Sequence, residues 1–468
     1  MERRDFVRLA IAAGLAPWLG ELAFSQVGTT IRVRKSATTL AASMDIDTLR
    51  SAVATLAANT TATDYKSWMY WANSHGTPDD IPASMAAVWY QCQHSNAQVA
   101  EHFLSWHRAY LFFFEALVRE LTQVDTFALP YWDWYTNSAV PPAFDQPMVG
   151  GNPNALYHGK RAYRTRTLVR TALTEPKFDD FQALLEGNPH GTIHVMVRGD
   201  MGSVETSARD PVFWAHHGNI DRMWEVWLAA DPARRNPSTP DWLSRRFAFD
   251  TQGNNALTVS QLLRTAVDLG YVYDSVTAEA HPEVVPNQPK KAIKVPRSPF
   301  ASVLKGAKVF TGTVTVSGPT QVDLRGGSLT LDFAVPRSAA GHIELLSVPE
   351  KNEGDAVVVF EGVTATPEGL SQGADYRIYV NLPEKSNPSL RHEDFYIGSI
   401  NTFSLSHHRD HPRELRFHLG ERAAALAKLG LWKPGELSVS FVSDDTDGAT
   451  ALIKIQGVRL EFVGQAIR

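Results

Sequence analysis

Two histidine-rich stretches are the residues of this chain best suited to chemistry. The first runs from Cys92 and His94 into E-H-F-L-S-W-H at 101–107, and the second from H-G-T-I-H at 190–194 into D-P-V-F-W-A-H-H-G at 210–218. Because the 468 residues include one cysteine, a metal held here would be bound almost entirely by imidazole nitrogen. Such a donor set suits copper, zinc, iron or nickel rather than magnesium or calcium. The sequence therefore predicts a transition-metal centre.

The second stretch offers three ligands for one metal. Histidines four apart at 190–194 share one face of a helix, although two surface histidines would show this spacing equally often. His216 and His217 point about 100° apart on a helix, so only one of them can face the same metal. His217 shares a helix face with Phe213 and Asp221. We predict His217 as the third ligand, with His216 packed behind it.

The first stretch leaves its ligand set open. His107 lies in a run of aromatic residues, where a buried imidazole needs a metal or a firm hydrogen bond. A hydrogen-bonded core histidine is the alternative. His75, His94 and His102 compete for two further places. His102 and His107 are about 140° apart on a helix, which makes a shared ligand face difficult and favours His94.

The elements that must position these residues follow from periodicity and length. The pattern predicts helices over 103–121 and 211–228, and ordered loops over 130–160. Beyond Phe300, seven short runs of alternating apolar residues predict a β-sandwich. The segments are V-F-T-G-T-V-T-V, S-L-T-L-D-F-A-V, H-I-E-L-L-S-V, A-V-V-V-F-E-G-V, Y-R-I-Y-V-N-L, E-L-S-V-S-F-V and A-L-I-K-I-Q-G-V-R-L-E-F. We expect an α + β protein of two or three domains.

Composition and the first residues indicate the partners. A net charge of -5 with 20% charged residues predicts no nucleic-acid partner, and it sets no oligomeric state. Arg3-Arg4 precedes an apolar run that is too short to span a bilayer. This pattern predicts a twin-arginine export signal over 1–25, a periplasmic or extracellular location and no membrane partner. A frayed N-terminal helix is the alternative.

Three motifs together resemble the type-3 dicopper family of tyrosinases, catechol oxidases and haemocyanins. They are F-L-S-W-H-R-A-Y-L at 103–111, P-Y-W-D-W at 130–134 and D-P-V-F-W-A-H-H-G-N-I-D-R-M-W at 210–224. The sandwich half is similar to that of plant polyphenol oxidases. The resemblance extends over nearly all of the chain after the signal and is strongest over 75–227.

The resemblance implies two copper ions with three histidine ligands each. These are His75, His94 and His107 on copper A, and His190, His194 and His217 on copper B. One departure is that the family's second copper A histidine stands nine residues before the third, where this chain has Gln98. A four-residue insertion would reconcile His94 with the family, while His102 stays an alternative ligand.

The resemblance also implies roles around the ligands. It implies a thioether cross-link between Cys92 and His94, with a buried free thiol as the alternative. Glu186 matches a glutamate that holds a water near copper B and could act as a general base, with a surface glutamate as the alternative. The residues expected to support the ligands are Arg108, His216 and Asp221, and those expected to line a substrate pocket are Gly191, Val195 and Phe213.

The resemblance implies oxidation of o-diphenols to o-quinones with dioxygen as co-substrate. Gly191 stands where many relatives carry an asparagine that helps to deprotonate monophenols, which favours diphenol oxidation over hydroxylation. The alternatives are an o-aminophenol oxidase, a haemocyanin-like oxygen carrier and a mononuclear metal protein.

The expected domain organisation includes a lid. We expect a four-helix-bundle dicopper domain at 40–235, a transitional segment at 236–280, a linker at 281–299 and the sandwich at 300–468. The sandwich is expected to cover the copper pocket and keep the enzyme latent until it is removed.

Overall fold

The computed structural model describes most of the chain after residue 30. The described residues are 31–76, 81–89, 92, 102–277, 283–295, 312–317, 321–334, 355–385, 387, 389–406, 411–432 and 436–464. The expected signal at 1–25, His94 and the expected strand at 342–348 lie outside them. Among these residues, no helix combines the length and apolar character needed to cross a bilayer.

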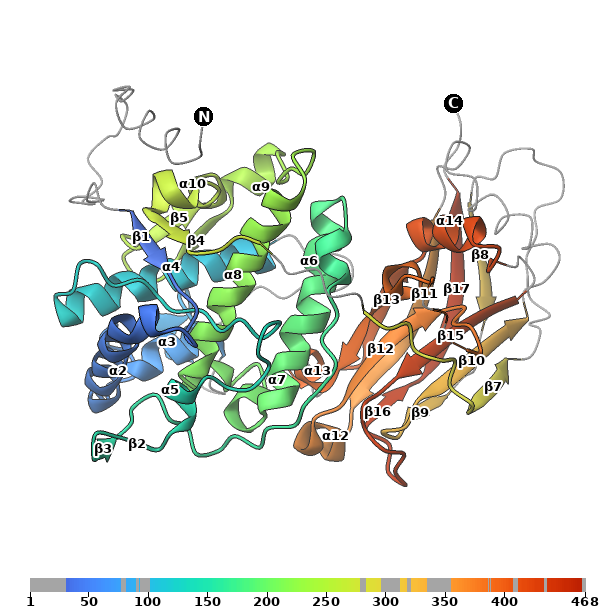
Figure 1. Cartoon of the computed structure of the whole chain (residues 1–468), viewed down its shortest axis with the longest axis horizontal. Coiled ribbons are helices and arrows are strands. Elements are labelled where there is room, and N and C mark those ends of the chain that lie inside the picture. Colours follow the sequence, from blue (N-terminus) through green and yellow to red (C-terminus); the bar gives the residue numbers. More distant parts are fainter. Residues whose placement is uncertain are drawn as a thin grey trace.

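The N-terminal half is a helical domain (Figure 1). Its principal helices are α2 (Ser43–Ala58), α3 (Trp68–His75), α4 (Phe103–Thr122), α5 (Pro142–Asp145), α6 (Phe178–Leu185), α7 (Thr192–Val197) and α8 (Val212–Ala230). The turn η4 (Glu186–Gly191) joins α6 to α7. Both helices expected from periodicity are present as α4 and α8, within two residues at each end.

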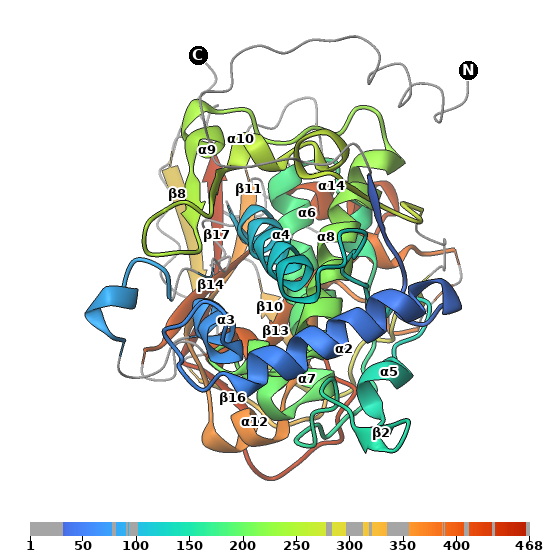
Figure 2. The same cartoon turned by 90° about the vertical axis from the view of Figure 1, so that its left-hand side faces the viewer.

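Helix α4 crosses the middle of this domain, and Figure 2 looks nearly along its axis. Long aromatic and aliphatic side chains bury most of its length, including Trp106, Tyr110 and Phe114. The helix ends where Gln123 adopts a left-handed conformation, with φ of 56°. Phe114 stacks on Trp214 of α8, with ring centroids 3.5 Å apart. This packing fixes the two helices that carry His107 and His217.

The segment expected to be transitional, 236–280, belongs to the same core. It forms α9 (Pro240–Ser244), β4 (Arg246–Ala248), β5 (Ala256–Thr258), α10 (Val259–Leu262) and β6 (Tyr271–Tyr273). Strand β6 pairs in parallel with β1 (Arg32–Arg34), and β2 (Met148–Val149) pairs with β3 (Asn152–Pro153). Phe249 and Tyr271 are buried in one hydrophobic cluster with the helices.

The C-terminal half is a β-sandwich, as expected. Among the described residues one sheet has the order β13-β12-β15-β10-β7, and the other β8-β17-β11-β16-β9 with β14 beside β11. Phe360 of one sheet faces Phe441 of the other, with centroids 5.3 Å apart, so the two inner faces share one core. The first sheet comprises β7 (Ala292–Val295), β10 (Leu329–Ala334), β12 (Asp375–Val380), β13 (Tyr396–Asn401) and β15 (Glu436–Val442). The second comprises β8 (Gly312–Ser317), β9 (Val322–Leu324), β11 (Asp355–Ala365), β14 (Arg413–His418), β16 (Ile453–Ile455) and β17 (Gly457–Gly464).

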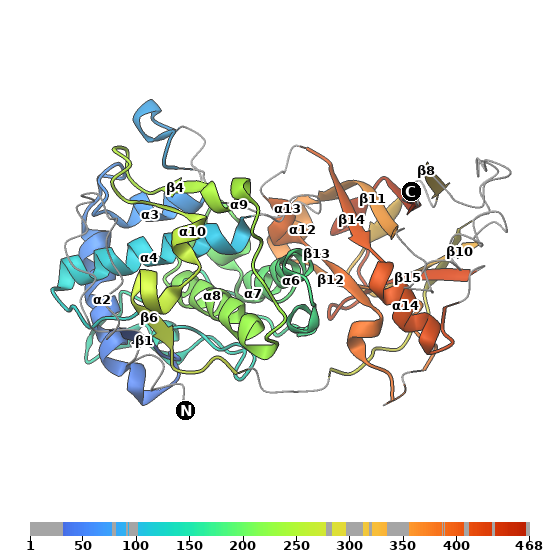
Figure 3. The same cartoon turned by 90° about the horizontal axis from the view of Figure 1, so that it is seen from above.

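The described part of the sandwich domain also contains the helices α12 (Pro367–Gln372), α13 (Thr402–Ser406) and α14 (Gly420–Lys428). In Figures 1 and 3, α12 and α13 lie on the side of the sandwich that faces α6 and α7. Strand β7 pairs with β10 and lies within the segment expected to be a linker. We therefore use the term linker for 283–291 alone.

Candidate metal centre

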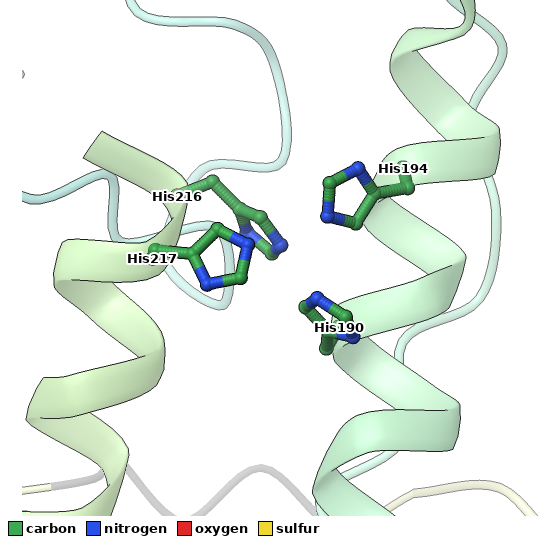
Figure 4. A group of neighbouring side chains, drawn as sticks. All are labelled: His190, His194, His216 and His217. Atoms are coloured by element: carbon green, nitrogen blue, oxygen red, sulfur yellow. The ribbon is translucent and has the colours of Figure 1, made fainter. Parts of the chain in front are cut away.

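One group of histidines lies where α7 meets α8. His190 is the penultimate residue of η4, His194 is on α7, and His216 and His217 are neighbours on α8. One potential ligand atom from each lies within 4.8 Å of the others, and all four residues are buried. Figure 4 shows the four rings converging from two helical ribbons. We call these four residues the His190 group.

A second group adjoins the first. His75 is the last residue of α3 and His107 is on α4, and their ring nitrogens lie within 4.8 Å of Cys92 Sγ and of each other. We call His75, Cys92 and His107 the His75 group. The rings of His107 and His217 are stacked, with centroids 4.3 Å apart and planes at 13°. The two groups therefore face one another across α4 and α8.

Backbone carbonyls fix the tautomers of four of these histidines. A carbonyl oxygen accepts only, so each Nδ1 must carry its proton and donate, which leaves the lone pair on Nε2. The donor–acceptor pairs, with their N–O distances, are His75 to Val204 at 3.1 Å, His107 to Phe103 at 2.8 Å, His190 to Glu186 at 3.2 Å and His194 to Met201 at 2.8 Å. Neutral imidazoles held in this way are prepared to ligate a metal through Nε2.

His216 and His217 differ in their hydrogen bonds. The indole Nε1 of Trp134 donates to His216 Nδ1 at 3.2 Å. Because indole is a donor only, neutral His216 carries its proton on Nε2 and offers no lone pair there. Neither ring nitrogen of His217 has a hydrogen-bond partner among the described residues. Burial, helped by the neighbouring His107, holds the pKa of His217 well below its usual value. These contacts favour His217 as the ligand.

His102 lies away from both groups. It precedes α4, where its ring stacks on Trp242 with centroids 5.9 Å apart and contacts Ser105 through Nδ1. Burial, together with the charge of Arg245, lowers its pKa to about 4. The described groups of potential ligands do not include His102. The competing residue, His94, stays a prediction because it lies outside the described residues.

Cys92 lies against His107. Its Sγ is 3.6 Å from Nε2 of His107. Burial, with a contribution from the carboxylate of Glu186, raises the pKa of the thiol well above its usual range. The expected thioether to His94 stays a prediction.

Arg108 and Asp221 pair across the two ligand helices. Arg108 Nε donates to Asp221 Oδ1 at 2.5 Å, and Arg34 Nη1 donates to Asp221 Oδ2 at 3.1 Å. Both side chains of the first pair are buried. Tyr271 and Tyr273 also donate to Asp221, at 2.6 and 2.5 Å. The network holds α4, α8, β1 and β6 in one arrangement behind the histidines.

Phe213, one of the expected pocket residues, lies at the junction of the two groups. The ring of Phe213 is 4.7 Å from that of His75 and 4.1 Å from that of His217, measured between centroids. Glu186 is buried at the start of η4. Val195 is buried in α7 and packs with Val204.

The sandwich domain covers this junction with residues that sequence reasoning missed. Phe403 of α13 stacks on His194, with centroids 3.7 Å apart and planes at 7°, and meets His190 edge-on at 5.5 Å. Asn401 lies over Gly191. No motif marks N-T-F-S-L-S, so only the three-dimensional pairing identifies these residues. Trp134, by contrast, could have been identified from the sequence, because it belongs to the P-Y-W-D-W motif.

Comparisons with known proteins agree with this geometry. Residues 65–165 and 150–230 match the model of the common central domain of tyrosinase. A tyrosinase of Hahella sp. (strain CCB-MM4) is 32% identical over 246 residues, which is 44% of this chain and 52% of the relative. The latent form of a chloroplastic polyphenol oxidase from Prunus armeniaca is 28% identical over 312 residues, 52% of each chain. This chain thus spans about half the length of these curated relatives.

A solved structure, that of latent apple tyrosinase, has the same fold. It superposes with a TM-score of 0.62 at 20% identity, covering 95% of this chain and 99% of that one. Residues 65–230 therefore carry the central domain of the tyrosinase family, and the fold of the chain resembles that of latent apple tyrosinase.

Two copper ions are the cofactor of this family, and the residues present fit them. The described residues place five buried imidazoles, those of His75, His107, His190, His194 and His217, in two adjoining groups. Neutral nitrogen donors of this kind suit copper. His94 would complete three ligands for each ion.

Proposed function

We propose that this protein oxidises o-diphenols to o-quinones with dioxygen. The observation that carries the proposal is the stacking of His107 on His217, which sets the two ligand groups side by side. The copper pair, when bound, would supply the transfer of two electrons from a catechol to dioxygen. The protein supplies the geometry, a dry pocket and the placement of the substrate.

The residues beside the copper B ligands set the expected selectivity. Glu186 is buried beside the His190 group and could accept a phenol proton directly or through a water. The residues that follow His190 and His194 are Gly191 and Val195, which offer no polar side chain for a monophenol. Catechols are therefore the preferred substrates, and monophenol hydroxylation is the weaker activity.

The sandwich domain acts as a lid that keeps the enzyme latent. Phe403 occupies the space over His194 in which an aromatic substrate would lie. Arg413 of the lid is partly buried, which lowers its pKa, and the carboxylate of Glu186 partly offsets that lowering. A lid in this position brings the cation of Arg413 towards Glu186 and places the ring of Phe403 over the predicted ligands. It would therefore hinder both proton transfer to Glu186 and entry of the substrate. Cleavage in the linker, 283–291, is expected to raise activity.

Paired oxygen-uptake assays test the function and the latency together. Copper-loaded protein, intact and cleaved in the linker, receives 4-methylcatechol or p-cresol. Rapid uptake with the catechol alone after cleavage supports the proposal. No turnover of either substrate by the cleaved protein would instead indicate an oxygen carrier. Preferred turnover of an o-aminophenol would identify the o-aminophenol oxidase, and one copper per chain would indicate a mononuclear site.

The proposed site of action is outside the cytoplasm. The twin-arginine pattern at Arg3-Arg4 supports export of a folded, metal-loaded protein. Replacement of both arginines by lysine is expected to keep the protein in the cytoplasm, which fractionation of the expressing cells measures.

A further inference from the structure

The last residue of β13, Asn401, connects the sandwich domain to η4, the turn that carries His190. Asn401 is fully buried. Its Nδ2 donates to the carbonyl of Gly187 in η4 at 3.1 Å. Its Oδ1 accepts from the backbone N–H of Ser404 at 2.9 Å within α13. Because both ends of the amide are hydrogen-bonded inside the protein, the side chain has little freedom to move.

Gly191 has no room for a side chain beneath this amide. A Cβ at residue 191 would lie 2.4 Å from Asn401 Nδ2 and 2.9 Å from Cγ and Oδ1. The backbone at Gly191 is ordinary right-handed helix, with φ of -61° and ψ of -33°, which any residue adopts. The backbone therefore gives no reason for glycine. The reason is the space taken by Asn401.

A neighbouring glycine shows that this restriction is local. Gly187 belongs to the same turn and faces the same domain. A Cβ at Gly187 would meet Ser399 at 3.7 Å or more, an ordinary contact. Gly187 thus tolerates a methyl group where Gly191 does not.

We infer that Gly191 and Asn401 are a size-complementary pair, so that the residue after the first copper B histidine decides whether the lid can close. The same position would face the substrate. A side chain placed there to tune selectivity would expel Asn401 and, with it, α13 and its Phe403. A side chain at position 191 therefore cannot both tune selectivity and allow the lid to close. The pairing rests on the lid of the proposed function, but not on the reaction that the coppers carry out.

Hydrogen exchange of the metal-free, full-length protein tests the pair. Gly191→Ala should force Asn401 away, at a cost of the order expected for overpacking. We expect the amides of α13, Thr402–Ser406, to exchange at least about tenfold faster than in the unmodified protein. Gly187→Ala is the matched control and should exchange as the unmodified protein does. Because no turnover is measured, the outcome is separate from that of the oxidase assay.

A compensating substitution makes the result decisive. Asn401→Ala removes the three atoms that the new Cβ would meet, so adding Gly191→Ala to it should produce no further acceleration. Equal exchange in the two single glycine variants, or additive effects in the double variant, would overturn the inference. If Gly191→Ala alone does not fold, the double variant decides: a folded protein with a docked α13 supports the pair, and a second failure to fold refutes it.

Discussion

The ring of Phe403 lies parallel to that of His194, with centroids 3.7 Å apart, although 208 residues lie between them in the sequence. This contact joins the C-terminal half of the chain to a predicted copper ligand. Its removal should open the pocket of the intact protein. We expect Phe403→Ala to raise catechol turnover without cleavage by roughly two- to tenfold, the range that one stacked aromatic pair contributes.

Phe395 provides the control for that substitution. It is fully buried in the core of the sandwich domain. Phe395→Ala should lower the melting temperature, because it leaves a cavity. Turnover of uncleaved Phe403→Ala that stays at the unmodified level, while the cleaved forms are fully active, would show that this ring does not block the pocket.

Substitution of the two neighbouring histidines of α8 should affect the copper content of the protein differently. Since Trp134 holds His216 in the tautomer with a protonated Nε2, we expect His216→Gln to retain two coppers per chain. His217→Gln should retain about one, because a ligand is lost. Elemental analysis after dialysis measures both. Loss of copper from the His216 variant alone would reverse the assignment.

The hydrogen bond from Trp134 also offers a subtler test. Trp134→Phe keeps an aromatic ring but removes the donor to His216 Nδ1. We expect copper affinity to fall by about tenfold, the lower end of effects reported for residues that orient ligands. Competition with a copper chelator measures the affinity. A parallel Trp132→Phe variant, whose indole donates to the carbonyl of Asn137 instead, should bind copper normally.

Glu115 should make the stability of the protein sensitive to acid. Burial alone would raise the pKa of its carboxyl, but Arg34, Arg119 and Arg32 outweigh burial and lower it to about 2, from an ordinary 4.5. Because the folded-state pKa is the lower one, this stabilisation is present above about pH 4.5 and is lost as the pH falls towards 2. Urea unfolding at pH 7 and pH 3 should reveal the loss.

The substitution Glu115→Gln should reduce the free energy of unfolding at pH 7 by about 3 kcal/mol, because it removes one of the two carboxylates that pair with buried Arg34. Glu120→Gln, on the same helix, breaks an exposed ion pair with Lys66 and should cost less than about 1 kcal/mol. Similar losses in the two variants would argue against the buried network as the source of stability.

Asp375 should make the docking of the sandwich domain weaken as the pH rises. It accepts a hydrogen bond from Thr192 of the helical domain at 3.2 Å. Burial raises its pKa to about 6, although Arg377 and Arg166 oppose the rise. Since the pKa is raised, the contribution of this group is complete below about pH 4 and is lost as the pH rises through 6.

Asp375→Asn should remove that dependence. Cleavage of the linker by a protease, compared with the unmodified protein at each pH from 4 to 8, measures docking. We expect the ratio of the two rates to change between pH 4 and 6 and to level off above. A constant ratio would exclude Asp375 as the titrating group.

Local patterns were sufficient for the fold and for naming most of the histidines that the structure brings together. The aromatic run of α4 and the motif of α8 set their own helices, and four-residue spacing placed His190 and His194 together. The physical reason for choosing His217 over His216 is the hydrogen bond from Trp134 to His216, and Trp134 is distant in sequence. Asn401 and Phe403 could not be predicted, because their role depends on which face of the sandwich meets α7.

The order of the two halves along the chain has a consequence for how the protein is made. The histidines of both groups precede residue 218, whereas Phe403 and Asn401 come nearly two hundred residues later. A ribosome therefore completes both histidine groups well before the residues of the proposed lid exist. Synthesis itself provides an interval in which the pocket is open to copper.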